Sequence, residues 1–155
     1  MILNISRHVR NLHNGEKIIN FLNMSKLTDS IKGKNKIIRH QISPYPRVLW
    51  VCKGEALREA PGRFTPLGFT WGEYEEYKGY NGMVFKVYET ETKDMGYLVW
   101  LDDDAYDTTC VHEAGHVALH LFQDIGEAGI YDAQEPFAYM LEWIYGRIKD
   151  CCNGK

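Results

Sequence analysis

The segment from Cys110 to Gln123 constrains the fold most, because its polar and apolar residues recur at the spacing of an α-helix. At about 100° per residue, one narrow face of this helix carries its polar groups: His112, His116, His120 and Gln123, with Glu113 beside them. The opposite side is predicted to be buried and consists of Ala114, Gly115, Ala118, Leu119, Leu121 and Phe122. We therefore expect a helix that packs on a core, turns its histidines to a cleft, and ends near residues 124–126.

The same segment has the pattern His-Glu-x-x-His, which is typical of zinc hydrolases. His112 and His116 are four residues apart, so both imidazoles point to one side of the helix, where one tetrahedral Zn²⁺ takes both. Glu113 lies about 100° round the helix from His112, too far for an easy ligand but close enough to reach a zinc-bound water. It is predicted to be the general base that takes the proton when that water attacks a carbonyl.

A catalytic zinc ion needs a third protein ligand. A second helix is expected after Pro136, from an apolar stripe at helical spacing: Phe137, Met140, Leu141, Ile144 and Ile148. At its start we predict Glu135 as the third ligand, with Asp132, Glu127 and Glu142, in that order, as the alternatives. Glu135 also fits a capping box with Asp132. Tyr139 is a candidate oxyanion stabiliser, as is a Tyr or Arg from residues 61–82.

Upstream of the histidine helix, the sequence predicts strands over residues 47–53, 83–90 and 96–102, the last two joined as a hairpin. Asp107 or Thr108 is expected to cap the helix. Residues 61–82 are rich in Gly, Pro and aromatic side chains. Two interpretations of that segment stay open: a lid or substrate-binding wall, or an irregular stretch that packs on the sheet.

Composition narrows the class of protein. The 155 residues are 45% hydrophobic, which predicts one folded domain, assigned to residues 41–155. Residues 1–40 hold eight Lys and Arg against two acidic residues, and we expect a basic N-terminal arm or helix packed on the domain. No nucleic-acid motif accompanies this charge, so no nucleic-acid partner is predicted. No apolar run reaches membrane-spanning length, no signal-peptide pattern begins the chain, and the four cysteines form no disulfide framework. These features favour a cytoplasmic location.

The segment His-Glu-Ala-Gly-His-Val-Ala-Leu-His, residues 112–120, resembles the His-Glu-Leu-Gly-His-x-x-Leu-His motif of the ImmA/IrrE metallopeptidases. Phe137-Ala138, followed by Leu141, resembles that family's Phe-Ala-x-x-Leu segment. Small zincin-like proteins of phages and prophages have a similar layout. The resemblance covers roughly residues 97–145. It departs from the family at Gln134-Glu135-Pro136, where an Ala-Asn pair is usual. The metzincin class is excluded, because Phe122 stands where its third histidine would be.

The resemblance implies an α+β fold of the gluzincin type: a small antiparallel sheet packed on the histidine helix and on a second, glutamate-bearing C-terminal helix. It also implies a zinc-dependent metallopeptidase of bacterial or mobile-element origin that cleaves a particular protein substrate. His120 is expected to support the site through a hydrogen bond or to line the cleft. The alternative is a catalytically silent zinc protein that acts as a structural, inhibitory or protein-binding module.

Overall fold

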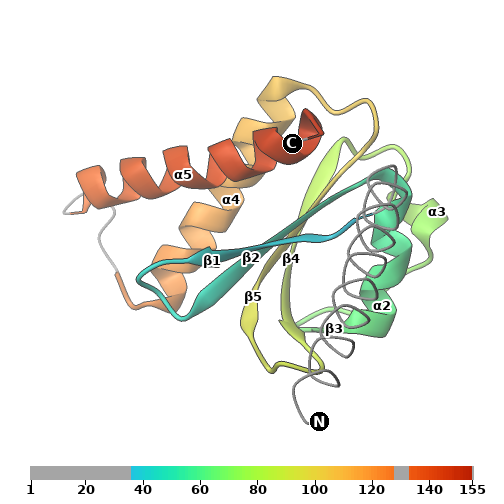
Figure 1. Ribbon diagram of the computed structural model, residues 1–155, viewed down its shortest axis with the longest axis horizontal. Helices are drawn as coiled ribbons and strands as arrows, with labels where there is room; N and C mark the ends of the chain where they lie inside the picture. Colours follow the sequence, from blue (N-terminus) through green and yellow to red (C-terminus); the bar gives the residue numbers. More distant parts are fainter. Residues whose placement is uncertain (1–35, 128–132, 155) are drawn as a thin grey trace, which may run out of the picture. The chain divides into compact units, whose positions relative to one another are not determined.

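The computed structural model describes residues 36–127 and 133–154, and Asn35–Lys155 form one compact unit. Within the described ranges the strands form one five-stranded sheet in the order β1-β2-β5-β4-β3 (Figure 1). The strands are β1 (Ile38–Ile42), β2 (Arg47–Lys53), β3 (Phe64–Pro66), β4 (Gly82–Glu89) and β5 (Met95–Leu101). The helices are the 3₁₀-helix η1 (Gly54–Glu59), α2 (Ala60–Arg63), α3 (Tyr74–Tyr77), α4 (Asp107–Asp124) and α5 (Gln134–Cys152). The chain is therefore an α+β protein.

The sheet is mixed, so the expectation of an antiparallel sheet is wrong. β4 and β5 form the predicted hairpin, and β1 pairs antiparallel with β2. β2 and β5, however, run parallel, with Val48 opposite Gly96 and Lys53 opposite Leu101. Parallel neighbours need a long crossover, and residues 54–94 supply it by passing through η1, α2 and β3 before the hairpin. That pairing joins segments far apart in sequence, which local patterns do not reveal.

The two central strands alternate between two cores, one on each face of the sheet. Leu49 and Val51 of β2, with Tyr97 and Val99 of β5, pack in the cluster that contains the apolar residues of α4 and α5. The side chains between them pack on the opposite face, against η1, α2 and α3: Val48, Trp50, Cys52, Leu98 and Trp100. In Figure 1, α4 and α5 lie on one side of the sheet and α2 and α3 on the other. Both strands are thus buried on both faces.

Helices α4 and α5 pack antiparallel. The ring of Phe137 lies 5.4 Å from that of Phe122, between the start of α5 and the end of α4. At the other end, the sulfur atoms of Cys110 and Cys152 lie 3.2 Å apart. The predicted stripe of α5 is confirmed: its members join one cluster with the buried residues of α4, namely Phe137, Met140, Leu141, Ile144 and Ile148.

Two details predicted for α4 are wrong. Leu119 was expected in the core, but 46% of it is exposed. Leu119 follows His112 by seven residues, almost two full turns, and therefore lies on the histidine side. The helix also begins one residue earlier than the predicted caps: Tyr106 is its N-cap, without a side-chain cap, and Asp107 is already helical. Asp107 instead accepts a hydrogen bond from Lys149 of α5, at 3.2 Å.

Strand β1 crosses the predicted boundary between residues 40 and 41, so residues 36–40 belong to the compact unit that contains α4. The rest of the predicted basic arm, residues 1–35, lies outside the described residues. The aromatic segment within residues 61–82 packs on the sheet: the rings of Phe69 and Trp71 lie 5.4 Å and 5.1 Å from that of Phe85 in β4. None of the helices in the described part of the chain is long and apolar enough to cross a bilayer.

Candidate functional site

Helix α4 positions the candidate site by burying one side and exposing the other. Its buried side consists of Cys110, Glu113, Ala114, Val117, Ala118, Leu121 and Phe122. His112 and His116 fall between these positions and are both exposed. The 3.6-residue repeat predicts this division, because residues at intervals of three and four fill the core and leave an intervening stripe outside.

The two histidines face each other. Their Nε2 atoms lie 3.1 Å apart, and the ring planes meet at 82°. Two nitrogens bound to one tetrahedral zinc at about 2.0–2.1 Å are roughly 3.3 Å apart by geometry. The pair therefore already has nearly the spacing that one zinc ion requires. At this distance one ring must donate its N–H to the other, since two lone pairs at 3.1 Å repel.

Glu113 lies under strand β4, and only 5% of it is exposed. An ideal Cβ built on Gly82 would fall 3.0 Å from Cγ of Glu113, 3.1 Å from its Oε1 and 3.0 Å from Cγ2 of Thr109. The absence of a side chain at Gly82 therefore lets α4 approach the sheet at this point. Burial raises the pKa of the Glu113 carboxyl, and the neighbouring His112 and His116 oppose that rise.

The structure does not bring the predicted third ligand to the histidines. Within residues 36–127 and 133–154, no group of three His, Cys, Asp or Glu side chains lies close enough together to hold a metal ion. Glu135 is exposed in the first turn of α5, near the end of α4 where Phe122 meets Phe137. Among its alternatives, Glu127 and Glu142 are exposed, and Asp132 lies outside the described residues. The role of Glu135 stays a prediction.

Tyr139, the predicted oxyanion stabiliser, is 68% exposed on α5. It follows the first turn of a helix whose inner side packs against the apolar side of α4. The histidines lie on the other side of α4, so the described arrangement gives Tyr139 no contact with them. Its catalytic role also stays a prediction.

His120 has a different environment from the other two histidines. Its ring stacks on that of Tyr97 in β5, with centroids 6.2 Å apart and an angle of 12° between the planes. Burial lowers the pKa of His120, and Lys86 lowers it further. His120 is thus held against the sheet.

A polar cluster that sequence reasoning missed fixes the end of α4. The hydroxyl of Tyr97 donates to Asp124 at 2.7 Å, and the ammonium of Lys86 in β4 donates to the other oxygen of the same carboxylate. Burial raises the pKa of Asp124, but the hydrogen bonds from Lys86 and Tyr97 outweigh it and hold the pKa below its usual value. The helix is therefore clamped to β4 and β5 one turn beyond His120. The contact depends on how α4 packs on β4 and β5, so local sequence patterns do not predict it.

In the described part of the chain, the first half of β4 has no strand partner on the side away from β5, beside Glu113. Short β3 pairs only with residues 87–89 of β4, and the N–H of Leu67 then donates to the carbonyl of Lys86 at 2.9 Å. Backbone groups alternate sides along a strand, so those of Val84 and Gly82 face the same edge as that carbonyl. No strand of the described part of the chain pairs with them there. Within residues 36–127 and 133–154, the backbone groups of Gly82 and Val84 thus have no strand partner on this edge, next to Glu113.

The local geometry therefore consists of two histidines at metal-ligand spacing, a buried carboxylate next to them and an open strand edge alongside. Comparison with known proteins adds no relative to this description. The chain matches no protein-family model, no curated protein and no solved structure.

Proposed function

We propose that this protein is a zinc-dependent metallopeptidase that hydrolyses a peptide bond in a protein or peptide substrate. The observation that carries the proposal is the 3.1 Å distance between the Nε2 atoms of His112 and His116. Imidazole nitrogens are common zinc ligands, and this spacing is close to the roughly 3.3 Å that a shared tetrahedral ion imposes. A hydrogen bond between the rings holds the pair in this position, and the same two nitrogens are the atoms that would bind the ion.

The donor set fits zinc better than a hard cation, because imidazole is a borderline ligand and calcium or magnesium prefers oxygen. His112 and His116 would hold the ion, and Glu135 is our proposal for the third ligand. A zinc ion bound there supplies Lewis-acid chemistry: it lowers the pKa of water toward about 7 and polarises a carbonyl.

Glu113 supplies the base in this proposal. Its carboxylate lies on the same turn as His112, is nearly fully buried, and has a raised pKa because of that burial. A raised pKa brings a carboxyl closer to neutral pH, where proton uptake and release are both efficient. The carboxylate of Glu113 takes a proton from the attacking water and then gives it to the leaving amine. A structural zinc site would need no such group.

The open edge of β4 supports an extended peptide as the substrate. A peptide strand that pairs with the outward backbone groups of Gly82 and Val84 runs alongside the site that holds Glu113. Backbone hydrogen bonds position such a strand whatever its side chains, and pockets then select particular residues. The substrate would therefore be an extended protein segment that is not already paired in a sheet of its own.

The test separates metal binding from catalysis. His116→Ala is expected to lose the zinc that the wild-type protein retains, about one ion per chain, by elemental analysis after dialysis. His120→Ala is the matched control, since it removes a histidine one turn further along whose ring stacks on Tyr97, and it is expected to keep zinc. Glu113→Gln is expected to keep zinc and lose at least ~10²-fold of the cleavage rate. Cleavage is measured by a proteome-wide screen for new termini.

Equal zinc in the wild type and in His116→Ala would refute the metal site. Zinc binding without any cleavage that depends on Glu113 would instead make the protein a metal-containing binding module. Glu135→Ala, compared with Glu142→Ala on the same helix, tests the third ligand. Equal zinc affinity in these two variants would exclude Glu135 and leave the histidine pair in place.

A further inference from the structure

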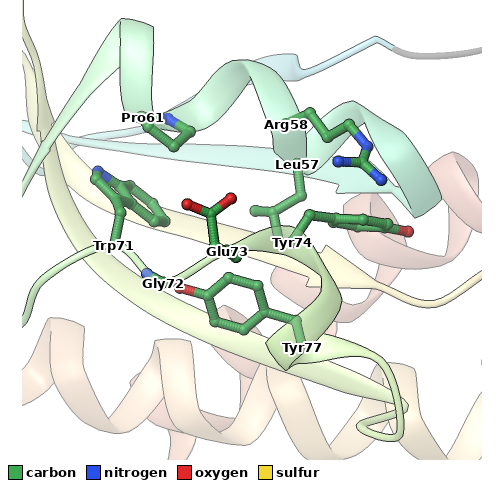
Figure 2. Close-up of a pocket in the computed structure, with 8 residues that line it drawn as sticks. All are labelled: Leu57, Arg58, Pro61, Trp71, Gly72, Glu73, Tyr74 and Tyr77. Carbon is green, nitrogen blue, oxygen red and sulfur yellow. Dashed lines mark hydrogen bonds between the residues drawn. The ribbon is translucent and has the colours of Figure 1, made fainter.

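A pocket of about 120 Å³ lies on the face of the sheet opposite to α4 (Figure 2). One wall comes from η1 and α2, and the other comes from the segment that leads into α3. Figure 2 shows the Glu73 carboxylate directed into the space between these walls. Apart from Arg58 and the backbone of Gly72, the rest of the lining is apolar or aromatic, formed by Leu57, Pro61, Trp71, Tyr74 and Tyr77. The volume is well below the roughly 300–1,000 Å³ of pockets for drug-sized ligands, so a single side chain or a small molecule fits.

The aromatic walls are fixed before any ligand arrives. The indole N–H of Trp71 donates to the carbonyl of Phe64 at 3.1 Å. The hydroxyl of Tyr77 accepts the backbone N–H of Gly72 at 2.9 Å. Both rings also pack on Phe85 in β4, with centroids 5.1 Å and 5.6 Å away. A rigid wall loses little conformational freedom on binding, which favours recognition of a small group.

The charged groups around the pocket are several carboxylates and one lining cation, Arg58. Burial raises the pKa of the Tyr74 hydroxyl, and the carboxylates of Asp102, Asp103 and Glu55 raise it further. Arg58 lowers it, but the guanidinium of Arg58 is itself paired with Glu75 at 2.6 Å. The chain's own cations already use this wall: the guanidinium of Arg58 lies 4.3 Å from the centre of the Tyr74 ring, and the ammonium of Lys78 lies 5.6 Å from it.

Glu73 differs from the neighbouring carboxylate in having no cation of its own. Glu75 accepts a hydrogen bond from Arg58 at 2.6 Å. In the described ranges, 36–127 and 133–154, no Lys, Arg or His forms an ion pair with Glu73. A carboxylate in an aromatic pocket is matched by an organic cation, which gains cation–π attraction from the rings and charge pairing from Glu73. Glu73 is exposed and takes part in the capping box of α3 with Glu76. An anion would be repelled by its charge, and a neutral apolar group would gain no charge pairing from it.

We propose that this pocket, which we call the Glu73 pocket, binds an alkylammonium group: a positively charged nitrogen on a short aliphatic stem. The stem contacts Leu57 and Pro61, and the charged end lies between Glu73 and the rings of Trp71 and Tyr77. The group comes either from a lysine side chain of a protein partner or from a free small amine. This inference is independent of the proposed zinc chemistry, since the Glu73 pocket and α4 lie on opposite faces of the sheet.

The experiment follows the indole N–H signals of the tryptophans by NMR during ligand titration, with the Trp71 signal assigned by its loss in Trp71→Phe. Two cations represent the two sources: N-acetyl-lysine methylamide for a side chain, and choline for a free amine. The control ligand is 3,3-dimethylbutan-1-ol, the uncharged analogue of choline. We expect saturable shifts of the Trp71 signal with a roughly millimolar dissociation constant for at least one cation, and at least about fivefold weaker binding of the alcohol.

Glu73→Gln keeps the shape of the side chain and removes its charge, and is expected to weaken cation binding at least about fivefold. Glu59→Gln is the matched control, because it removes a nearby exposed charge that does not line the pocket. Trp143, on α5, reports any non-specific effect. Tighter binding of the lysine derivative identifies a protein partner as the source, and tighter binding of choline identifies a free amine. Equal affinity for choline and the alcohol, an unchanged affinity in Glu73→Gln, or no binding of either cation would overturn the proposal.

Discussion

Gly82→Ala tests the close contact between β4 and Glu113 of α4. A methyl group at this position would lie 3.0 Å from Cγ of Glu113 and 3.0 Å from Cγ2 of Thr109. Carbon atoms in proteins normally stay about 3.5–4.0 Å apart, so α4 must retreat from β4 by several tenths of an ångström. Overpacking of this kind costs about 1–3 kcal/mol, and the replacement of glycine by alanine returns about 0.5–1 kcal/mol of backbone entropy. We expect a net loss of about 1–2 kcal/mol.

The assay is thermal and urea denaturation of the metal-free protein. A loss of 1–2 kcal/mol lowers Tm by roughly 4–8 °C in a domain of this size. Thr109→Ser removes one of the three crowding atoms, Cγ2 of Thr109, so the double variant is expected to recover about 0.5–1 kcal/mol relative to additivity. Gly62→Ala is the control, since no atom lies within 4 Å of the added methyl group. If Gly82→Ala is as stable as the wild type and shows no coupling to Thr109→Ser, the close approach of α4 to β4 is wrong.

Two other substitutions test the sheet and its attachment to α4. In Gly96→Ala the new Cβ would fall 1.8 Å from the carbonyl oxygen of Val48 on the paired strand. We therefore expect the free energy of unfolding to fall by more than ~3 kcal/mol, with no cooperative unfolding transition by circular dichroism. A normal transition would contradict the parallel register of β2 and β5. Asp124→Asn is expected to cost about 2 kcal/mol at pH 7, because it removes a charge that accepts hydrogen bonds from Lys86 and Tyr97. The folded-state pKa of Asp124 lies below its usual 3.8, so its contribution is present above about pH 4 and disappears as the pH falls through the lower value. Urea denaturation from pH 7 to pH 2 measures this, with the exposed Asp150→Asn as a control that changes little.

The elements with a strong repeat could be predicted from the sequence. The bounds predicted for β2 agree with the structure, and the stripe of α5 packs as expected, because local hydrophobic periodicity determines both. Strand β1 was missed, although Ile38, His40 and Ile42 alternate with the exposed Arg39 and Gln41. Three of these five residues, Arg39, His40 and Gln41, are charged or polar, so the alternation gives only a weak signal for a strand at the edge of the sheet.

The candidate site is also only partly predictable from the sequence. The pairing of His112 with His116 depends only on helix geometry, so their spacing follows from the sequence. The surroundings of Glu113 depend on where β4 crosses α4, and nothing near Glu113 in the sequence indicates Gly82. The Glu73 pocket likewise forms only because η1 and the segment before α3, which are separated in sequence, pack against each other. Contacts of this kind are tertiary, and local propensity carries no information about them.

The parallel pairing of β2 with β5 also has a consequence for the order of folding. The β1–β2 and β4–β5 hairpins join neighbouring segments, and hairpins of this kind form in about 1–10 μs. Joining them requires closure of the connection over residues 54–81, a non-local step that is intrinsically slow. Helix α4 gains its packing surface only afterwards, since that surface combines Leu49 and Val51 from one hairpin with Tyr97 and Val99 from the other. We therefore expect the histidine pair to be among the last parts of the molecule to become fixed.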